Sequence, residues 1–221
     1  MRNRVRRNLF FLSILVLLIL LGSVVSGKKD ENFSGNVQAE GTPEFENNVI
    51  ESNAGYNRLL QHYQKADTGS KEGYLVSGIS AEGFPEYYCG AYMNTSGGLV
   101  VLLNRKWDDE ALEEARKEIY EKTFCRNIAF RMADNSYSRL INVMESILLF
   151  TQSDEYQSCG FNIVGFGIDD EKNTVILYSD ITDEKDKLFV VSLTEGFSDL
   201  QFEYQTEGDR DTASSSYGSG I

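Results

Sequence analysis

Few side chains in this chain could serve as a nucleophile, a general base or a metal ligand, and His62 is the only histidine among its 221 residues. A Ser-His or Cys-His couple therefore has a single candidate base. Zinc sites built from several histidines are excluded. His62 lies on the polar side of an apolar helical stripe that includes Leu59 and Tyr63, and nothing in the sequence places it near a nucleophile. We expect an ordinary surface histidine.

The remaining acid–base candidates are carboxylates, which are densest in residues 169–171 and 183–186. Neither run has the ordered oxygen-ligand spacing of a calcium loop, so a hairpin turn and a helix cap are the favoured interpretations. A glycosidase needs two carboxylates held about 5 to 9.5 Å apart, which any acidic protein could offer. Gly97 and Gly98 lack the spacing of a phosphate-binding loop. The sequence therefore predicts no catalytic residue, no metal site and no cofactor.

Aromatic residues are concentrated around a predicted hairpin. They are Tyr87, Tyr88, Tyr92 and Trp107. The two-residue period of a strand predicts Tyr88 and Tyr92 on one face and Tyr87 on the other. Core packing of a small sheet accounts for most of these rings. An exposed remainder could stack on sugars or bind a protein, so Tyr87, Tyr92 and Trp107 form the candidate binding surface.

The three cysteines are an odd number for an exported chain. Cys125 and Cys159 could pair and leave Cys89 free, but connectivity cannot be read from a sequence. The alternative is that each is a buried, unpaired small hydrophobe.

The N-terminus predicts export. Four arginines precede an apolar run at residues 9–21, and no further charge occurs before Lys28. Residues 1–27 therefore have the features of a signal peptide with small residues at its end. The uncharged stretch at residues 9–27 is also close to the length of a membrane-spanning anchor, and the arginines before it fit a cytoplasmic N-terminus. Both alternatives place the rest outside the cell, either anchored through residues 9–27 or secreted.

The exported part is strongly acidic. Four of the 21 basic residues and none of the 34 acidic residues lie in the first 27 positions, so the rest carries 17 basic against 34 acidic residues, a net charge of −17. This charge repels nucleic acid and anionic lipid headgroups, and we expect no nucleic-acid partner. It suits solubility outside the cell, or attraction to a basic partner protein.

The elements that must position these side chains come from an internal repeat. Residues 90–103 match residues 165–178 without a gap in apolar pattern and in turn position. Each copy predicts a strand, a polar turn and a second strand, followed by an acidic helix and a third strand. Gly98 and Asn173 share a turn position, and both residue types tolerate a positive φ.

The predicted fold class is α+β, with two ββαβ units that have small antiparallel sheets. A helix joins the two units, and an N-terminal membrane or signal helix precedes them. A helical segment begins at Thr42 and is interrupted or divided at Gly55. The predicted boundaries after the signal segment are a flexible neck at 28–41, the helical segment and a loop at 42–83, the first ββαβ unit at 84–135, a connecting helix at 136–152, the second ββαβ unit at 153–205, and a disordered tail at 206–221.

The residues FPEYYCGAYM at 84–93, a small turn and LVVL at 99–102 resemble a signature in the prodomains of alpha-lytic-type secreted serine proteases. They are also similar to uncharacterised exported proteins of Gram-positive bacteria that carry this module without a protease. The second copy matches through Gly165, Phe166, Ile168, Asp169, Asn173, Val175 and Ile176. The resemblance covers residues 84–205 and implies the fold and a tendency to bind another protein. No Ser-His-Asp domain follows, so we expect no role in folding a protease in cis.

The sequence thus predicts a non-enzymatic, extracytoplasmic binding or accessory module at the bacterial cell surface. A trans-acting inhibitor or folding helper of a secreted serine protease is the alternative, with an open sheet edge pairing with its target. A hydrolase built on carboxylates is the remote alternative.

Overall fold

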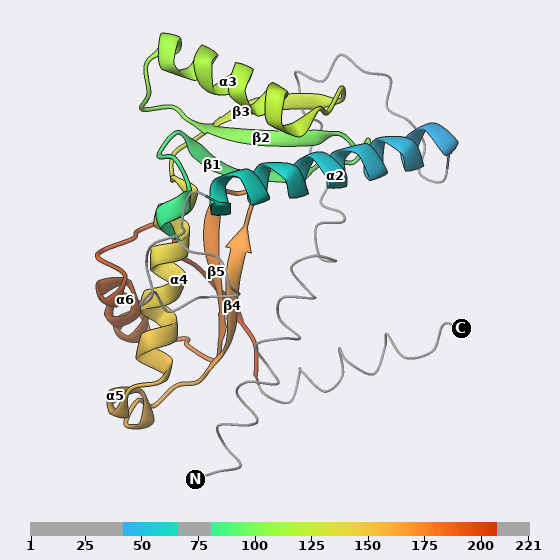
Figure 1. The fold of residues 1–221 in the computed structure, drawn as a ribbon. Coiled ribbons are helices and arrows are strands. Elements are labelled where there is room, and N and C mark those ends of the chain that lie inside the picture. The colour runs from blue at the N-terminus through green and yellow to red at the C-terminus, as the bar shows by residue number, and fades with distance from the viewer. Residues whose placement is uncertain (1–41, 66–80, 207–221) are drawn as a thin grey trace. The chain divides into compact units, whose positions relative to one another are not determined.

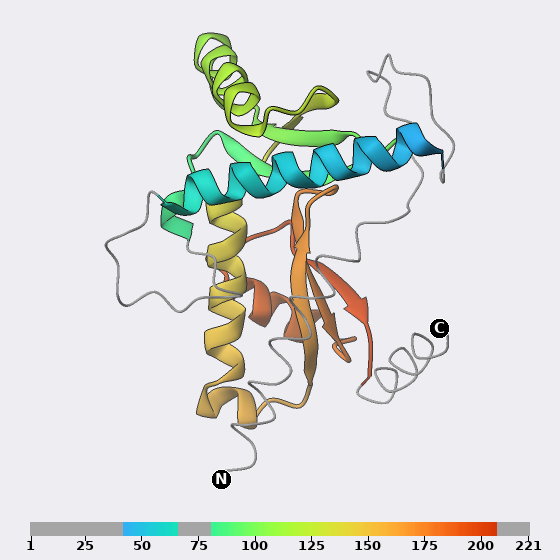
Figure 2. The same cartoon turned by 45° about the vertical axis from the view of Figure 1, so that its right-hand side comes forward.

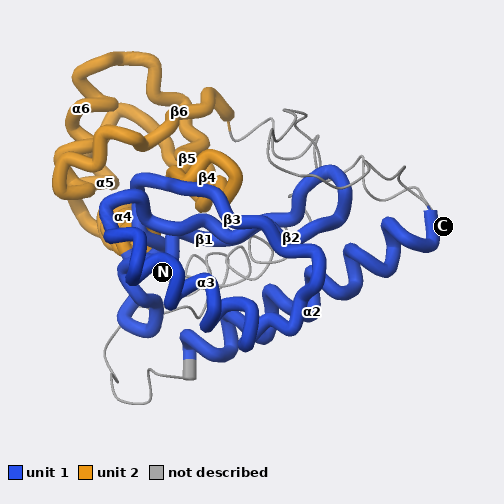
Figure 3. The backbone as a smooth tube through the Cα atoms, turned by 90° about the horizontal axis from the view of Figure 1, so that it is seen from above, with its two compact units in different colours: residues 1–138 blue, residues 139–221 orange. Residues whose placement is uncertain are grey.

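The structure is a computed structural model that describes residues 42–65 and 81–206. The chain divides into two compact units, residues 1–138 and residues 139–221, and each is described by itself (Figure 3). Among the described residues, no helix is long and apolar enough to cross a membrane.

Several predicted segments lie outside the described residues. These are the signal or anchor segment at 1–27, the neck at 28–41, nearly all of the loop at 67–83 and the tail after residue 206. Only a short 3-10 turn, η1 (Ala81–Gly83), belongs to the described part of that loop.

Helix α2 (Pro43–Lys65) is continuous, so the predicted interruption or division at Gly55 is wrong. The helix begins as predicted, because the Phe45 N–H donates a hydrogen bond to Thr42 Oγ1 at 3.2 Å. Gly55 serves packing instead. A Cβ atom at this position would lie 3.2 Å from Cys125 Cβ, so the absence of a side chain lets the helix approach the neighbouring chain closely.

The first unit contains a three-stranded sheet in the order β1 (Tyr88–Met93), β2 (Leu99–Asn104) and β3 (Ile128–Ala133). Strands β1 and β2 are antiparallel, as predicted, but β2 and β3 are parallel. The predicted all-antiparallel sheet is therefore wrong for the third strand. The reason is the crossover helix α3 (Asp109–Thr123), which returns the chain to the start of β2 before β3 begins.

A β-bulge in β1 changes which faces its tyrosines occupy. Tyr88 is opposite Leu103 and Gly90 is opposite Leu102, so one extra residue is inserted between them. Gly90 takes a φ of 124° there, which favours glycine. The bulge shifts the side-chain alternation by one residue, and Tyr88 and Tyr92 therefore lie on opposite faces. The prediction that they share a face is wrong.

The turn between β1 and β2 also differs from expectation by one residue. The positive φ occurs at Gly97 (75°) rather than at Gly98, whereas Asn173 has the expected positive φ (53°) in the second repeat. The first turn is held by Asn94, whose Oδ1 accepts hydrogen bonds from the N–H groups of Ser96 and Gly98.

Helix α3 is capped by Asp108, whose Oδ1 accepts a hydrogen bond from the Ala111 N–H at 2.9 Å. Helices α2 and α3 contact each other, and α2 runs along the sheet of β1–β3 in both views of the fold (Figure 1, Figure 2). The buried apolar residues of both helices recur at helical spacing, which explains why this stripe faces inward. The buried apolar side chains of these two helices are Leu59, Tyr63, Leu112, Ala115 and Ile119.

The second unit repeats the same strand arrangement in the order β4 (Ile163–Asp169), β5 (Thr174–Ser179) and β6 (Gln201–Tyr204). Strands β4 and β5 are antiparallel, β5 and β6 are parallel, and β4 carries a bulge between Ile163 and Gly165. The two glycines aligned by the repeat, Gly90 and Gly165, thus lie at corresponding bulges. The α+β fold class with two small three-stranded sheets is confirmed.

Three helices complete the described chain: α4 (Tyr137–Thr151), α5 (Asp154–Gln157) and α6 (Glu184–Leu193). Helix α4 buries an apolar stripe that includes Leu140, Ile141 and Ile147. In α6, Val190 is buried and Leu188 is 62% exposed. The short helix α5 was not predicted.

All three cysteines are described and all are free thiols. Cys89 and Cys125 are buried, which fits the interpretation as small hydrophobes, and Cys159 is partly exposed. Burial raises the pKa of Cys89 to about 12.

Candidate functional site

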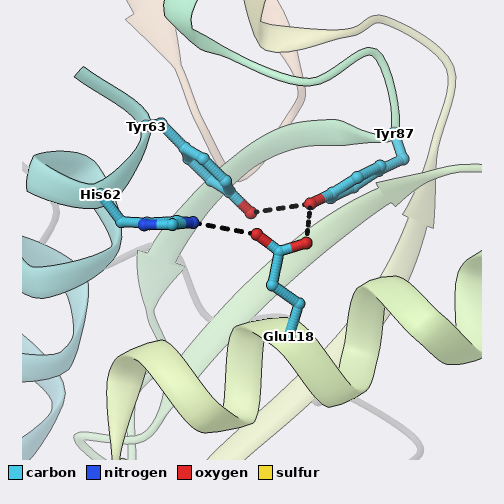
Figure 4. A network of polar contacts seen from close by, with 4 residues as sticks. All are labelled: His62, Tyr63, Tyr87 and Glu118. Carbon is cyan, nitrogen blue, oxygen red and sulfur yellow. Dashed lines mark hydrogen bonds and ion pairs between the residues drawn. The ribbon is translucent and has the colours of Figure 1, made fainter. Parts of the chain in front are cut away.

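Four polar side chains of the first unit form a network of contacts (Figure 4). His62 Nε2 lies 3.0 Å from Glu118 Oε1. The Tyr87 hydroxyl donates to Glu118 Oε2 at 2.8 Å. The Tyr63 and Tyr87 hydroxyl oxygens are 3.5 Å apart, at the limit of a hydrogen bond. Both carboxylate oxygens of Glu118 are therefore engaged.

Three elements supply this network. His62 and Tyr63 come from the last turn of α2, Glu118 from the middle of α3, and Tyr87 from the residue before β1. The helical stripe that buries Tyr63 leaves its neighbour His62 at the edge, where 37% of its side chain is exposed. Glu118 is similarly half-buried. The network joins α2, α3 and the entry to the sheet at the margin of the core.

Burial makes the two phenols poor acids. Burial raises the pKa of Tyr87 to about 12; the contact with the Tyr63 hydroxyl opposes this shift, and the hydrogen bond to Glu118 adds to it. Burial is also the main reason that the pKa of Tyr63 lies well above its ordinary value. Both hydroxyls are therefore protonated at neutral pH, and Tyr87 can act as a donor to Glu118. The groups satisfy one another, which is the behaviour of a structural connection between elements.

The candidate binding residues Tyr87 and Trp107 come together. Their rings meet edge to face with centroids 5.9 Å apart, and Trp107 is 39% exposed. Tyr92 differs, because it is 7% exposed and lies in the buried cluster with Cys89, Val100 and Leu102. The Arg131 Nη1 donates to its hydroxyl at 2.7 Å. The bulge in β1 explains why Tyr92 lies on the face opposite Tyr88.

The dense carboxylate runs lie where the sequence placed them. Asp169 is at the end of β4 and its two oxygens bind the backbone N–H and the ammonium group of Lys172, both at 3.0 Å. Asp183 caps α6 through the Lys185 N–H. Within residues 42–65 and 81–206, no group of three or more potential ligands could hold a metal ion.

Asp170 has an unusual environment in the same turn. Its Oδ1 atom is enclosed, and no described residue donates a hydrogen bond to it. Burial, and secondarily the negative charge of Asp169, raises the pKa of Asp170 to about 7. The residue as a whole is only partly buried, although its Oδ1 atom is enclosed.

Sequence reasoning missed Glu118 and Tyr63 as partners of His62. The four residues are separated by up to 56 positions, and no spacing rule connects them. The only signal was the position of His62 beside a buried tyrosine at the end of an amphipathic helix, which predicts a partner at the margin of a neighbouring element.

The comparisons with known proteins concern this first unit. A family model described as "Pro-like N-terminal domain" matches residues 39–132. The match runs from the start of α2 nearly to the end of β3, so it contains the whole four-residue network, and the second repeat lies outside it. No curated protein matches the chain. Residues 39–132 are thus similar to the Pro-like N-terminal domain and form a prodomain-like module.

Proposed function

We propose that the chain is a non-enzymatic binding or accessory module that acts outside the cytoplasm at the bacterial cell surface and takes another protein as its ligand. The observation that carries this proposal is the match of residues 39–132 to a Pro-like N-terminal domain. The contacts of the four-residue network support it, because His62, Tyr87 and Glu118 bind one another and so join secondary-structure elements.

The binding surface in this proposal is the pair Tyr87 and Trp107. Tyr87 is fixed by its hydrogen bond to Glu118, and its ring supports Trp107 from the edge. A partly exposed tryptophan held in one orientation loses little conformational entropy when a partner covers it. Tyr92 has no part in this surface, because it is buried.

The experiment is site-specific photo-crosslinking on intact cells, with p-benzoylphenylalanine in place of Trp107. The matched control has the same group in place of Tyr204, another exposed aromatic residue, in the second unit. The proposal predicts a discrete adduct with a single protein from position 107 and not from position 204. No adduct at 107, or the same adducts from both positions, would contradict it.

Export and anchoring belong to the proposal as well. The arginines and the apolar run at residues 9–21 favour either a membrane anchor or a cleaved signal peptide. Cell fractionation with N-terminal sequencing of the mature chain separates the two. A full-length chain in the cytosolic fraction would contradict both.

A trans-acting inhibitor or folding helper of a secreted serine protease is the second candidate. It is favoured by the same family match and by the outer edge of β3, the last strand of its sheet, which no strand of the described residues covers. Progress curves of an alpha-lytic-type protease with increasing amounts of the full chain test it. Saturable inhibition that Trp107→Ala or Met132→Lys weakens supports the candidate, and unchanged protease activity at every concentration removes it.

A further inference from the structure

The outer edge of β3 lacks the features that normally prevent strands from pairing. Exposed edges are usually blunted by short length, proline, bulges or charges. Strand β3 has six residues, IAFRMA, with no proline, glycine or acidic residue. Its one charged side chain, Arg131, is turned onto the Tyr92 hydroxyl at 2.7 Å.

The other comparable edges are blunted. Strand β1 follows Pro85 and is interrupted by the bulge at Gly90. Strand β6 occupies the position equivalent to β3 in the second repeat, but it has four residues and carries Glu203. The repeat therefore provides an internal comparison in which only β3 retains an apolar edge of full length among these three.

The backbone of β3 shows which groups face outward. The Leu99 N–H donates to Asn127 O at 2.9 Å, and the Arg105 N–H donates to Ala133 O at 3.0 Å. Odd-numbered residues thus direct their backbone groups toward β2, and the even-numbered residues Ile128, Phe130 and Met132 direct theirs away from it. Of these groups, Met132 O already receives a long 3.5 Å contact from Arg105 Nη2.

In one antiparallel register, this edge of β3 can form hydrogen bonds with the same edge of a second copy of the chain. With Phe130 opposite Phe130 of the second copy, Ile128 of each chain is opposite Met132 of the other. All three pairs are then of the hydrogen-bonded type and exchange their outward N–H and C=O groups. Arg131 is opposite the small Ala129 rather than opposite another arginine, so the two guanidinium groups do not face each other directly.

The same register also matches charges at both ends of the strand. It places Asp134, which follows β3, opposite Arg126 of the second copy, which precedes β3. Both residues are exposed, and Asp134 also pairs with Arg105 at 2.7 Å. A two-fold axis generates this pair twice, so a strongly acidic chain meets its copy through two attractive contacts at this edge.

Apolar side chains beside the edge add to the contact. Tyr120 of α3 is 47% exposed and packs edge to face on Phe130 with centroids 5.2 Å apart, and Met132 is 39% exposed. On the two-fold axis these side chains would meet their counterparts on one face of the joined sheets.

We propose that two copies of this chain associate through antiparallel pairing of β3 with β3, centred on Phe130, and join two three-stranded sheets into one of six strands. The inference does not depend on the proposed function, because the binding surface there is Tyr87 and Trp107. An edge contact of this length is smaller than a standard interface, so the dimer is expected to be weak.

The test is the solution mass of the full chain in mild detergent, measured by light scattering up to about 100 μM. The wild type is expected to reach the mass of two chains as concentration rises. Met132→Lys places a charge on the edge and should weaken the dimer by about tenfold or more. The control Leu188→Lys adds the same charge at an exposed leucine of α6 and should leave the dimer intact.

A charge exchange tests the register and does not rely on the edge variant folding. Arg126→Asp alone and Asp134→Arg alone should each weaken the dimer, and the double variant should restore it. A wild-type chain that is monomeric at every concentration overturns the proposal, and so does a dimer that Met132→Lys leaves unchanged. Failure of the double variant to restore association overturns pairing centred on Phe130.

Discussion

Removing the Glu118 carboxylate should loosen the connection between α2, α3 and the entry to β1. Glu118→Ala takes away both oxygens at once, one 2.8 Å from the Tyr87 hydroxyl and the other 3.0 Å from His62 Nε2. Glu118→Gln keeps an oxygen that can accept from Tyr87, but it removes the charge and replaces the oxygen that faces His62 by an NH2 group. The two variants therefore separate the hydrogen bond from the ion pair.

The magnitude follows from the exposure of each contact. The Tyr87 hydroxyl is half-buried and donates to an ionised group, so its loss costs about 1.5 kcal/mol of unfolding free energy. The His62–Glu118 pair has side chains 37% and 38% exposed, so solvent screening limits it to about 0.5 kcal/mol. Glu118→Ala should thus destabilise the first unit by about 2 kcal/mol, and Glu118→Gln by about 1 kcal/mol or less.

Urea unfolding followed by tryptophan fluorescence measures this effect. Trp107 is the only tryptophan and its ring contacts Tyr87, so its emission reports the first unit. A loss below about 0.5 kcal/mol for Glu118→Ala would refute the structural role, because that is the range of an ordinary surface substitution. Equal losses of unfolding free energy in the alanine and glutamine variants would refute the claim that the hydrogen bond from Tyr87 contributes separately from the charge of Glu118.

Three further predictions concern packing, backbone strain and pH. Gly55→Leu should destabilise the first unit by about 1–3 kcal/mol, because a Cβ atom at this position would already lie 3.2 Å from Cys125 Cβ. Leucine by itself favours helices, so a variant that is more stable in the fluorescence assay would contradict the close approach of α2 to Cys125. Phe124→Gly should stabilise the same unit by about 1 kcal/mol, because Phe124 follows α3 with a φ of 49° and is 75% exposed; a loss of stability would show that the phenyl ring packs usefully. Asp170→Asn should stabilise the chain above pH 7 and have little effect below pH 4. The folded pKa of Asp170 is raised to about 7, above the ordinary value of about 3.9, so the cost of the buried charge is absent at low pH and grows as pH rises through this window. Urea unfolding followed by circular dichroism at pH 4 and pH 8 measures the difference in stability, and a pH-independent effect would contradict the prediction.

Local patterns predicted most of the secondary structure. The capping residues Thr42 and Asp183 mark helix starts where the sequence placed them, because a cap depends only on its own turn of helix. The gapless match between residues 90–103 and 165–178 predicted two hairpins, since register and turn chemistry are also local.

Long-range features could not be obtained in this way. The direction of β3 depends on where α3 crosses, and the face of Tyr92 depends on one inserted residue at Gly90. Gly55 was interpreted as a helix breaker because its neighbour Cys125 lies 70 positions away in sequence. For the same reason the site was predicted only in part: Tyr87 and Trp107 meet as neighbours of one hairpin, whereas Glu118 joins them from another element.

The central claim is that Glu118 positions a protein-binding surface and does not react. The yield of the photo-adduct at position 107 in the Glu118→Gln chain tests it most directly, with folding checked by circular dichroism in the same preparation. The account predicts a folded variant that forms the adduct in nearly wild-type yield, because glutamine can still hold Tyr87 beneath residue 107. A variant that folds as the wild type does and loses the adduct would contradict it.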